Sequence, residues 1–322
     1  MQGTISVVVP SEYDNQDLTV LESLRDVRYT KDRLEVILST GNYPSIQRNK
    51  AAEEAKGDIL YFFNGDSRIE PDIFNKVIGI FNKDEKIAGV GGPDLTPDDN
   101  NCLQQLFGYA MGSYFAHWKM RARYTQIGKE RVSNEEELLL SNLAIRRDIY
   151  LKSNGFDKRL YPNEENELIN RIVEMGYKFI YSPDIKIYRD RRKTILAFMR
   201  QFYRYGQGRM GQIFIEGWPR NVQFFIPPLF LFYLLMLPFA VKFWFAFIPL
   251  YIYSFLAILD AMYLSRKHKK NLILGLPATY LIMHAFYALG MCGGLLRNLT
   301  GAGYKQGRNY KPKVKIIKSL GR

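Results

Sequence analysis

The sequence predicts an α/β protein with a Rossmann-like sheet, followed by an interfacial helix and C-terminal transmembrane helices. Short apolar runs at residues 5–10, 34–38 and 59–63 alternate with helical periodicity at 17–24 and 46–56. This β-α-β-α-β alternation requires parallel strands joined by right-handed crossovers. Apolar segments follow at 222–241, 243–264 and 272–296. Each of them is long enough to cross about 30 Å of hydrocarbon.

Each early element has its own sequence signal. Pro10 ends the first strand, and Gly57 lies just past the end of the second predicted helix. The run 59–63 is wholly apolar, which is typical of a strand buried on both faces of a parallel sheet. The pattern then predicts a helix at 71–81, a strand at 87–90, a strand at 141–145, an amphipathic helix at 163–173 and a last strand at 178–188.

The charge balance restricts the partners. The chain has 322 residues, with 45 Lys and Arg against 32 Asp and Glu, a formal net charge of +13. Such an excess suits nucleic acid, an anionic membrane surface or phosphorylated substrates. Because the basic residues cluster beside apolar segments, we expect membrane lipids as a partner and no nucleic acid.

The cysteines and the N-terminus suggest a compartment. Cys102 and Cys292 are far apart, so no disulfide framework or zinc spacing is predicted. The first strand begins within a few residues of Met1, without a signal peptide pattern. We therefore expect a cytoplasmic catalytic domain at the inner face of the plasma membrane, in a multi-pass protein.

Composition shifts predict four regions. A catalytic domain at 1–190 precedes an amphipathic interfacial region at 191–221, a transmembrane region at 222–297 and a basic tail at 298–322. The interfacial assignment rests on one helical stripe with arginines beside it: Ile195, Phe198, Met199, Phe202 and Tyr205. The alternative is a helix packed on the soluble core.

Membrane topology is left open by the sequence. With the catalytic domain inside, the basic run 266–270 also lies inside after two crossings, as the positive-inside rule requires. A third crossing would place the basic tail outside. We therefore expect one of the three apolar segments to be re-entrant or interfacial, and the sequence does not say which.

Polar residues follow the predicted strands where each strand ends. The run 59–63 stops at Asn64-Gly65-Asp66, and the first two strands end near Pro10, Glu12 and Thr40. Ligands bind at the carboxyl ends of strands in such sheets. The Asp66 carboxylate can hold a hard cation, which in turn can hold a diphosphate. A plain Asn-Gly turn would explain Asn64 and Gly65, but not the matching features elsewhere.

The order of the motifs resembles family 2 inverting glycosyltransferases with a GT-A catalytic domain. Residues 7–10 resemble that family's opening strand, and 63–66 stand where it has Asp-x-Asp. The other matching blocks are 47–49 with 55–58, the Gly-Phe-Asp at 155–157 with the acidic block at 163–168, and the Gln-x-x-Arg-Tyr at 201–205. The last block resembles a motif of processive polysaccharide synthases, and 201–206 before several spans resembles succinoglycan-type exopolysaccharide glucosyltransferases.

The resemblance implies a sugar transfer from a nucleotide-diphosphate sugar to a lipid-linked oligosaccharide or polysaccharide acceptor. Glu165 takes the position of the general base, and Asp66 that of a ligand for Mg²⁺ or Mn²⁺. The candidate donor contacts are Pro10, Glu12, Thr40, Arg48, Asn64, Asp66 and Arg189. The candidate acceptor contacts are Asn142, Glu164, Gln201, Arg204 and Tyr205. The alternative for the acidic block is a helix N-terminus whose dipole favours acidic residues.

Departures from the family pattern concern the metal. The family usually has Asp at the positions of Asn64 and Glu165, and often His near Arg189. We predict weak metal binding, with Arg189 helping to stabilise the leaving diphosphate. The alternative for Arg189 is a surface residue that pairs with Asp190 or faces lipid headgroups.

Two other functions stay open. One is transfer to a polyprenyl phosphate, which would make a lipid-phosphate sugar. The other, from a different class, is a catalytically inactive membrane scaffold that retains donor binding. Asn64 and Arg189 keep the second possibility open, because they weaken the expected metal site.

Overall fold

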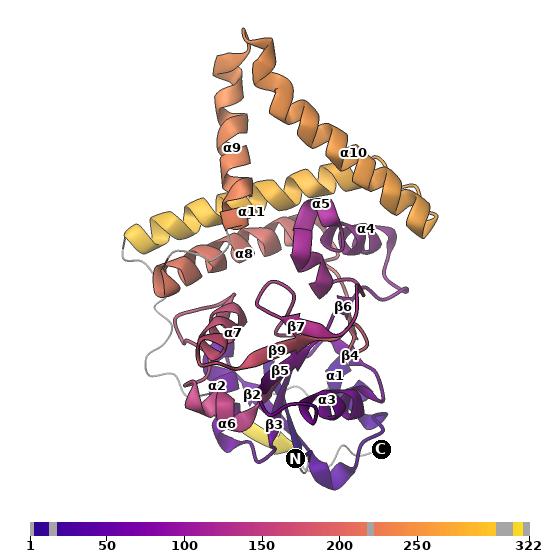
Figure 1. Ribbon diagram of the computed structural model, residues 1–322, viewed down its shortest axis with the longest axis vertical. Helices are drawn as coiled ribbons and strands as arrows, with labels where there is room; N and C mark the ends of the chain where they lie inside the picture. Colours follow the sequence, from indigo (N-terminus) through magenta and orange to yellow (C-terminus); the bar gives the residue numbers. More distant parts are fainter. Residues whose placement is uncertain (1–2, 13–17, 218–221, 301–311, 318–322) are drawn as a thin grey trace. The chain divides into compact units, whose positions relative to one another are not determined.

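A computed structural model describes residues 3–12, 18–217, 222–300 and 312–317, and the chain divides into two compact units (Figure 1). The sheet unit comprises Met1–Pro97, Ala122–Asp190 and Tyr304–Arg322, and the helical unit comprises Asp98–Arg121 and Arg191–Gly303. From the sequence we predicted that residues 98–121 belong to the first domain and that residues 298–322 form a separate basic tail. In the structure the first segment belongs to the helical unit, and part of the tail belongs to the sheet unit.

The sheet unit contains a mixed eight-stranded sheet in the order β11-β2-β1-β3-β8-β5-β9-β7. Its strands are β1 (Ile5–Ser11), β2 (Leu34–Thr40), β3 (Ile59–Phe63), β5 (Ile87–Gly91), β7 (Arg131–Ser133), β8 (Asn142–Arg146), β9 (Lys178–Tyr181) and β11 (Lys313–Ile317). Strand β1 pairs in parallel with β2 and β3, which confirms the predicted parallel core. Strand β8 runs antiparallel between β3 and β5.

The predicted last strand, 178–188, is wrong as a single element. A turn closed by the Ile185 N–H on the Ser182 carbonyl, at 3.2 Å, separates β9 from β10 (Ile187–Arg189). Strand β10 joins a second, three-stranded sheet with β4 (Ser67–Ile69) and β6 (Asp94–Leu95). Because β10 pairs antiparallel with β4, Arg189 lies opposite Ser67, directly after the β3 loop.

Helices cover both faces of the large sheet. They are α1 (Thr19–Arg25), α2 (Pro44–Glu54), α3 (Ile73–Phe81), α6 (Arg147–Lys152) and α7 (Glu164–Glu174), with a 3-10 turn at Lys31–Arg33. The alternation of side chains along a strand divides the core in two. Val7 and Val9 pack into the cluster that contains α1 and α3, whereas Val8 packs into the cluster that contains α7. All three valines are fully buried, as expected for a strand covered on both faces.

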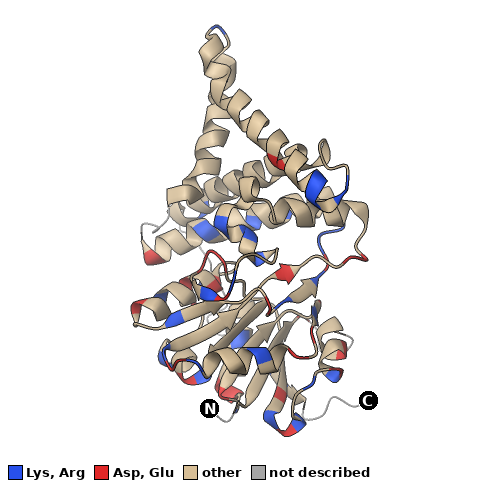
Figure 2. Ribbon diagram, turned by 45° about the vertical axis from the view of Figure 1, so that its right-hand side comes forward, with Lys and Arg blue, Asp and Glu red and all other residues tan. Residues whose placement is uncertain are grey.

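The helical unit is built from long helices. Its α-helices are α4 (Cys102–Met111), α5 (Tyr114–His117), α8 (Ile195–Glu216), α9 (Ile226–Met236), α10 (Ile248–His268) and α11 (Gly275–Leu299). Short 3-10 turns occur at Trp118–Arg123, Val222–Phe225, Leu237–Ala240 and Trp244–Phe247. The segments Val222–Ala240, Trp244–His268 and Gly275–Leu299 are long and apolar enough to cross a membrane. Figure 2 shows no charged residues on α9, whereas α10 carries an acidic residue and a basic end.

Helix α8 contains the residues that we predicted to form an interfacial stripe, but some of them are buried. Phe198 and Phe202 are buried, and Phe198 stacks on Phe107 of α4 with ring centroids 3.9 Å apart. Ile195 remains exposed. Two members of the stripe therefore pack inside the helical unit and are not available to a lipid surface.

Candidate active site

The loop after β3 is both a tight turn and the edge of a polar site. The Ser67 N–H donates to the Asn64 carbonyl at 3.1 Å, so the predicted Asn-Gly turn is present and leads directly into β4. Asn64 is half-buried and Asp66 is exposed. The turn thus leaves the Asp66 carboxylate open to solvent at the carboxyl end of the central strand.

Three consecutive residues of α2 tie the strand ends to the other motifs. The Gln47 side-chain amide donates to the Ser11 and Ser39 carbonyls, at 2.8 and 2.6 Å, and so joins the ends of β1 and β2. Asn49 donates to the Phe156 carbonyl at 2.8 Å and accepts from the Phe156 N–H at 2.9 Å. These bonds hold the Gly-Phe-Asp loop in place. We identified this loop as a motif from the sequence but predicted no role for Asn49.

Arg48, the middle residue, forms a buried ion pair. One guanidinium nitrogen lies 2.8 Å from the Glu164 carboxylate, and the other donates to the Asn64 side-chain oxygen at 3.4 Å. We predicted that Arg48 contacts the donor and that Glu164 contacts the acceptor. In the structure the two side chains bind each other, and Arg48 connects the β3 loop to the first turn of α7.

Burial is the main cause of the shifted pKa of the Glu164 carboxyl group. The side chain is 2 % exposed, and burial raises its pKa to about 7, although the Arg48 charge opposes the shift. A second carboxylate, on Glu165, acts in the same direction as burial. Glu164 therefore holds its proton to a higher pH than an ordinary glutamate does.

Glu165 differs from the two glutamates around it. Glu164 is bound to Arg48, and Glu167 makes two hydrogen bonds to Arg171, at 2.7 and 2.6 Å. Glu165 is 7 % exposed, and among the described residues no hydrogen bond or ion pair is found for its carboxylate. A nearly buried carboxylate near a helix N-terminus, without a protein partner, is available to a substrate proton.

A second charged group connects the β3 loop to the small sheet. The Arg189 Nε lies 3.0 Å from the Asp66 carboxylate, and its Nη1 lies 3.2 Å from the Asp94 carboxylate. Asp94 is fully buried and also accepts from the Ser141 hydroxyl at 3.1 Å. Asp190, the alternative partner for Arg189, pairs with Arg68 at 3.2 Å.

Asp94 is a site residue that sequence reasoning missed. A signal was present, because Asp94 directly follows Gly91-Gly92-Pro93 at the end of the predicted strand 87–90. A carboxylate after a buried strand is the same pattern that drew attention to Asp66. Its partner, Arg189, is far away in the sequence, so the pattern alone did not connect the two.

Some of the other predicted contact residues lie at strand ends, and one is buried. Pro10, Glu12 and Thr40 lie at the ends of β1 and β2, and Glu12 is exposed. Asn142 is wrong as an acceptor contact, because it is fully buried and its amide is bonded on both sides. It donates to the Ile185 carbonyl at 2.8 Å and accepts from the Tyr61 hydroxyl at 2.7 Å.

The predicted acceptor residues on α8 belong to the helical unit. Gln201 donates to the Tyr205 hydroxyl at 2.8 Å and accepts from Arg192 at 2.9 Å. Arg204 is exposed. The motif at 201–205 is thus a single polar face on one helix, with Gln201 and Tyr205 one turn apart.

The residues that the structure describes do not form a metal centre by themselves. Within the described ranges, no group of three or more His, Cys, Asp or Glu side chains is placed to hold a metal ion. Asp66 supplies one carboxylate, and Arg189 already contacts it. A cation here would need most of its ligands from a bound phosphate group and water, which is usual for Mg²⁺.

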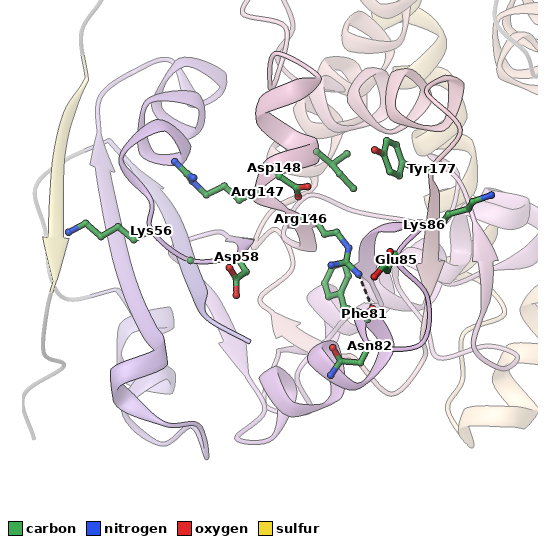
Figure 3. Close-up of a pocket in the computed structure, with 12 residues that line it drawn as sticks. Lys56, Asp58, Phe81, Asn82, Glu85, Lys86, Arg146, Arg147, Asp148 and Tyr177 are labelled. Carbon is green, nitrogen blue, oxygen red and sulfur yellow. Dashed lines mark hydrogen bonds between the residues drawn. The ribbon is translucent and has the colours of Figure 1, made fainter. Parts of the chain in front are cut away.

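A large groove lies elsewhere on the sheet unit (Figure 3). It measures about 760 Å³ and is lined by Lys56, Asp58, Arg146 and Arg147 among others. Asp58 precedes β3 and Arg146 ends the antiparallel strand β8, so the groove lies at the edge opposite Asn64 and Asp66. Arg146 donates there to the Ile87 and Phe81 carbonyls. We assign no catalytic role to this groove.

The fold and the strand-end site define a glycosyltransferase of the GT-A type. The chain matches the solved structure of a mannosyltransferase from Pyrobaculum calidifontis in complex with GDP-Man and Mn²⁺. The TM-score is 0.56 at 16% identity, covering 90% of this chain and 86% of that one. Residues 59–290 match the model of glycosyl transferase family group 2, and the chain belongs to that family.

Two further comparisons add little. S. aureus TarS aligns with a TM-score of 0.40 at 12% identity, over 71% of this chain and 47% of that one. Curated protein sequences include no match to the chain.

Proposed function

We propose that the protein transfers a sugar, with inversion, from a nucleotide-diphosphate sugar to a lipid-linked oligosaccharide or polysaccharide at the cytoplasmic membrane face. The observation that supports the proposal most strongly is the environment of the Glu165 carboxylate. It is the acidic residue of the α7 block that is nearly buried and, among the described residues, has no partner. The resemblance of the acidic block 163–168 to the family's motif, together with this availability, supports Glu165 as the base.

The reaction needs one proton transfer and one displacement. The Glu165 carboxylate takes the proton of an acceptor hydroxyl, whose oxygen forms the new bond to the anomeric carbon. The bond from that carbon to the diphosphate breaks on the opposite face, and the nucleoside diphosphate leaves with the electron pair. Attack opposite the leaving group inverts the anomeric configuration.

The leaving diphosphate needs positive charge. We propose that Asp66 would hold Mg²⁺ or Mn²⁺ together with the donor phosphates, as the Mn²⁺ in the mannosyltransferase complex suggests. The metal would neutralise the charge that develops on the diphosphate. Arg189 lies 3.0 Å from Asp66 and carries a permanent charge with planar donors that suit phosphate. Buried Asp94 keeps that guanidinium next to Asp66.

The acceptor class rests on the helical unit. Gln201, Arg204 and Tyr205 resemble the acceptor motif of polysaccharide synthases, and the same unit contains three helices apolar enough to cross a membrane. A succinoglycan-type acceptor fits that combination. A polyprenyl phosphate is the alternative acceptor, and it would be met at the same membrane surface.

Donor binding is tested by thermal shift of the purified full-length protein against a panel of nucleotide sugars, with and without Mn²⁺. We expect stabilisation by one sugar nucleotide that Mn²⁺ increases. Asp66→Ala should remove the Mn²⁺ increment, and Asp72→Ala, a half-buried acid on the same unit, is the matched control. No shift with any nucleotide sugar, in wild type, would contradict the proposed donor class.

A further inference from the structure

We infer that the chain crosses the membrane twice, through the segments 222–240 and 244–268. Helix α11 then lies in the membrane interface beside α8, and the C-terminus returns to the side of the sheet unit. The inference rests on the membrane location in the proposed function, and it resolves which apolar segment does not cross.

The first argument comes from the last strand. β11 pairs antiparallel with β2 over its whole length, from Lys313 opposite Thr40 to Ile317 opposite Val36. Val314 and Ile316 pack on one core cluster of the sheet unit and Ile317 on the other. Residues 313–317 are therefore part of the same folded unit as the candidate active site, and they share its aqueous compartment.

The second argument concerns the link between α11 and β11. Helix α11 ends at Leu299, and residues 300–312 connect it to the strand. That sequence is glycine-rich and polar, and it contains Lys305, Arg308 and Lys311. Such a segment cannot recross the hydrocarbon core, because its backbone groups and charges would lack partners there. The end of α11 is therefore already on the side of the sheet unit.

The start of the membrane region lies on that same side. Helix α8 begins at Ile195, soon after β10 of the sheet unit. It contains Arg200, Arg204 and Arg209 and is not among the segments apolar enough to cross. The chain thus enters and leaves the region 222–299 on one side, so the number of crossings is even.

The packing of α11 identifies it as the helix that does not cross. A Cβ on Gly206 of α8 would lie 2.1 Å from the Tyr287 carbonyl, and one on Gly290 would lie 2.0 Å from the Tyr203 carbonyl. A Cβ on Gly294 would lie 2.8 Å from the Met210 Cβ. The two backbones are in contact along these turns and run in the same direction (Figure 1). Helix α11 therefore stays at the depth of the arginine-bearing helix α8.

Helix α11 also makes polar contacts to other elements of the helical unit. His284 contacts the Ala116 carbonyl at 3.1 Å, and the Tyr280 hydroxyl donates to Asp260 at 2.5 Å. The Ser113 hydroxyl donates to the same carboxylate at 2.7 Å. These contacts join α11 to α5 and to the second half of α10, which ends at His268 within the basic run 266–270. In the span window of α11 39% of residues are buried, against 6% and 11% for the other two.

The segments on either side of residues 241–243 form the crossing hairpin. The first has 19 residues, or about 28 Å of helix, which matches the hydrocarbon thickness. Phe230 of α9 stacks on Tyr253 of α10 at 4.4 Å, and the Tyr233 hydroxyl donates to the Ala246 carbonyl at 2.7 Å. Most of their large apolar side chains are exposed, as lipid contact requires.

The inference is tested by labelling single cysteines in sealed membrane vesicles of both orientations with an impermeant maleimide. The background carries Cys102→Ser and Cys292→Ser. The probes are Lys31→Cys in the sheet unit, Lys242→Cys in the hairpin, Lys269→Cys before α11 and Thr300→Cys after it. We expect Lys31→Cys, Lys269→Cys and Thr300→Cys to be labelled from one side and Lys242→Cys from the other.

Two results would overturn the inference in distinguishable ways. Labelling of Thr300→Cys from the same side as Lys242→Cys means that α11 crosses. Extraction of the protein by alkaline carbonate, with all four positions labelled from one side, means that the membrane location itself is wrong.

A cross-link tests the strand pairing independently of labelling. Thr40 and Lys313 are directly paired, so Thr40→Cys with Lys313→Cys should form a disulfide under mild oxidation. Thr40→Cys with Lys315→Cys is the matched control, two residues out of register and beyond about 7 Å. Equal or absent cross-linking in both pairs would overturn the return of the C-terminus to the sheet.

Discussion

The two units differ in where they place charged and apolar side chains. The sheet unit buries charged side chains at its site, including Arg48, Glu164 and Asp94, each with an ionic partner. The helical unit instead exposes large apolar side chains along α9 and α10, such as Phe232 at 60% and Phe255 at 61%. Large exposed apolar side chains are unfavourable in water, and charged side chains are unfavourable in lipid. The contrast is consistent with the proposal that chemistry and anchoring belong mainly to different units, and each prediction below probes one side of it.

The largest expected effect is on the chemical step in the sheet unit. Glu165→Gln should lower sugar transfer by about 10²-fold or more, because the acceptor proton loses its base. Donor affinity, measured by thermal shift, should stay close to that of wild type. The matched control is Glu54→Gln, on the surface of α2. Transfer within a few fold of wild type would reject Glu165 as the base.

The next effect concerns backbone contact in the helical unit. Gly206→Ala should destabilise by about 1–3 kcal/mol, because its methyl group would force α8 away from α11. Gly79→Ala in α3 is the matched control, since no atom lies within 4 Å of the new Cβ. A helical alanine there should stabilise by roughly 0.5–1 kcal/mol. Denaturation of full-length protein in detergent measures both, and equal effects would remove the proposed close packing.

A smaller effect is expected in the metal requirement. Asn64→Asp adds a carboxylate and Arg189→His replaces a competing cation, so either variant should need less Mn²⁺, by up to about tenfold. Activity titrated against Mn²⁺ measures this, with exposed Arg192→His as the control. If all the variants match wild type in metal requirement and donor affinity, Arg189 lies outside the reaction.

The smallest effect is a pH dependence of stability. Burial raises the pKa of Glu164 to about 7, so the folded protein keeps a proton that the unfolded chain releases near pH 4.5. Stability therefore falls as pH rises between about 4.5 and 7. Melting curves between about pH 5 and 7.5 should show Glu164→Gln losing less stability than wild type, whereas Glu54→Gln should follow wild type. Parallel curves for all three proteins would mean that the pKa is ordinary.

The sequence predicted what depends on local pattern. Strand β3 was located at its observed bounds because five apolar residues are followed by a turn, and β1 and β2 were found for the same reason. Asp66 was predicted from its position after a strand, and Glu165 from the resemblance of the acidic block to the family's motif.

Features that depend on distant partners were missed. Strand β11 carries alternating lysines and becomes a strand only through β2. Asn142 looked like an available amide, and only tertiary packing reveals that Tyr61 and Ile185 occupy it. The pairing of Asp94 with Arg189 likewise joins two segments far apart in sequence.

The most direct measurement follows a radiolabelled sugar. Full-length protein in lipid nanodiscs, supplied with a lipid extract from its own host, is given the nucleotide sugar that stabilises it. We predict that label moves into the organic-solvent-extractable lipid-linked fraction with wild type, and that Glu165→Gln leaves it on the nucleotide. Label retained on the nucleotide by wild type, despite donor binding, would contradict the account and indicate an inactive scaffold.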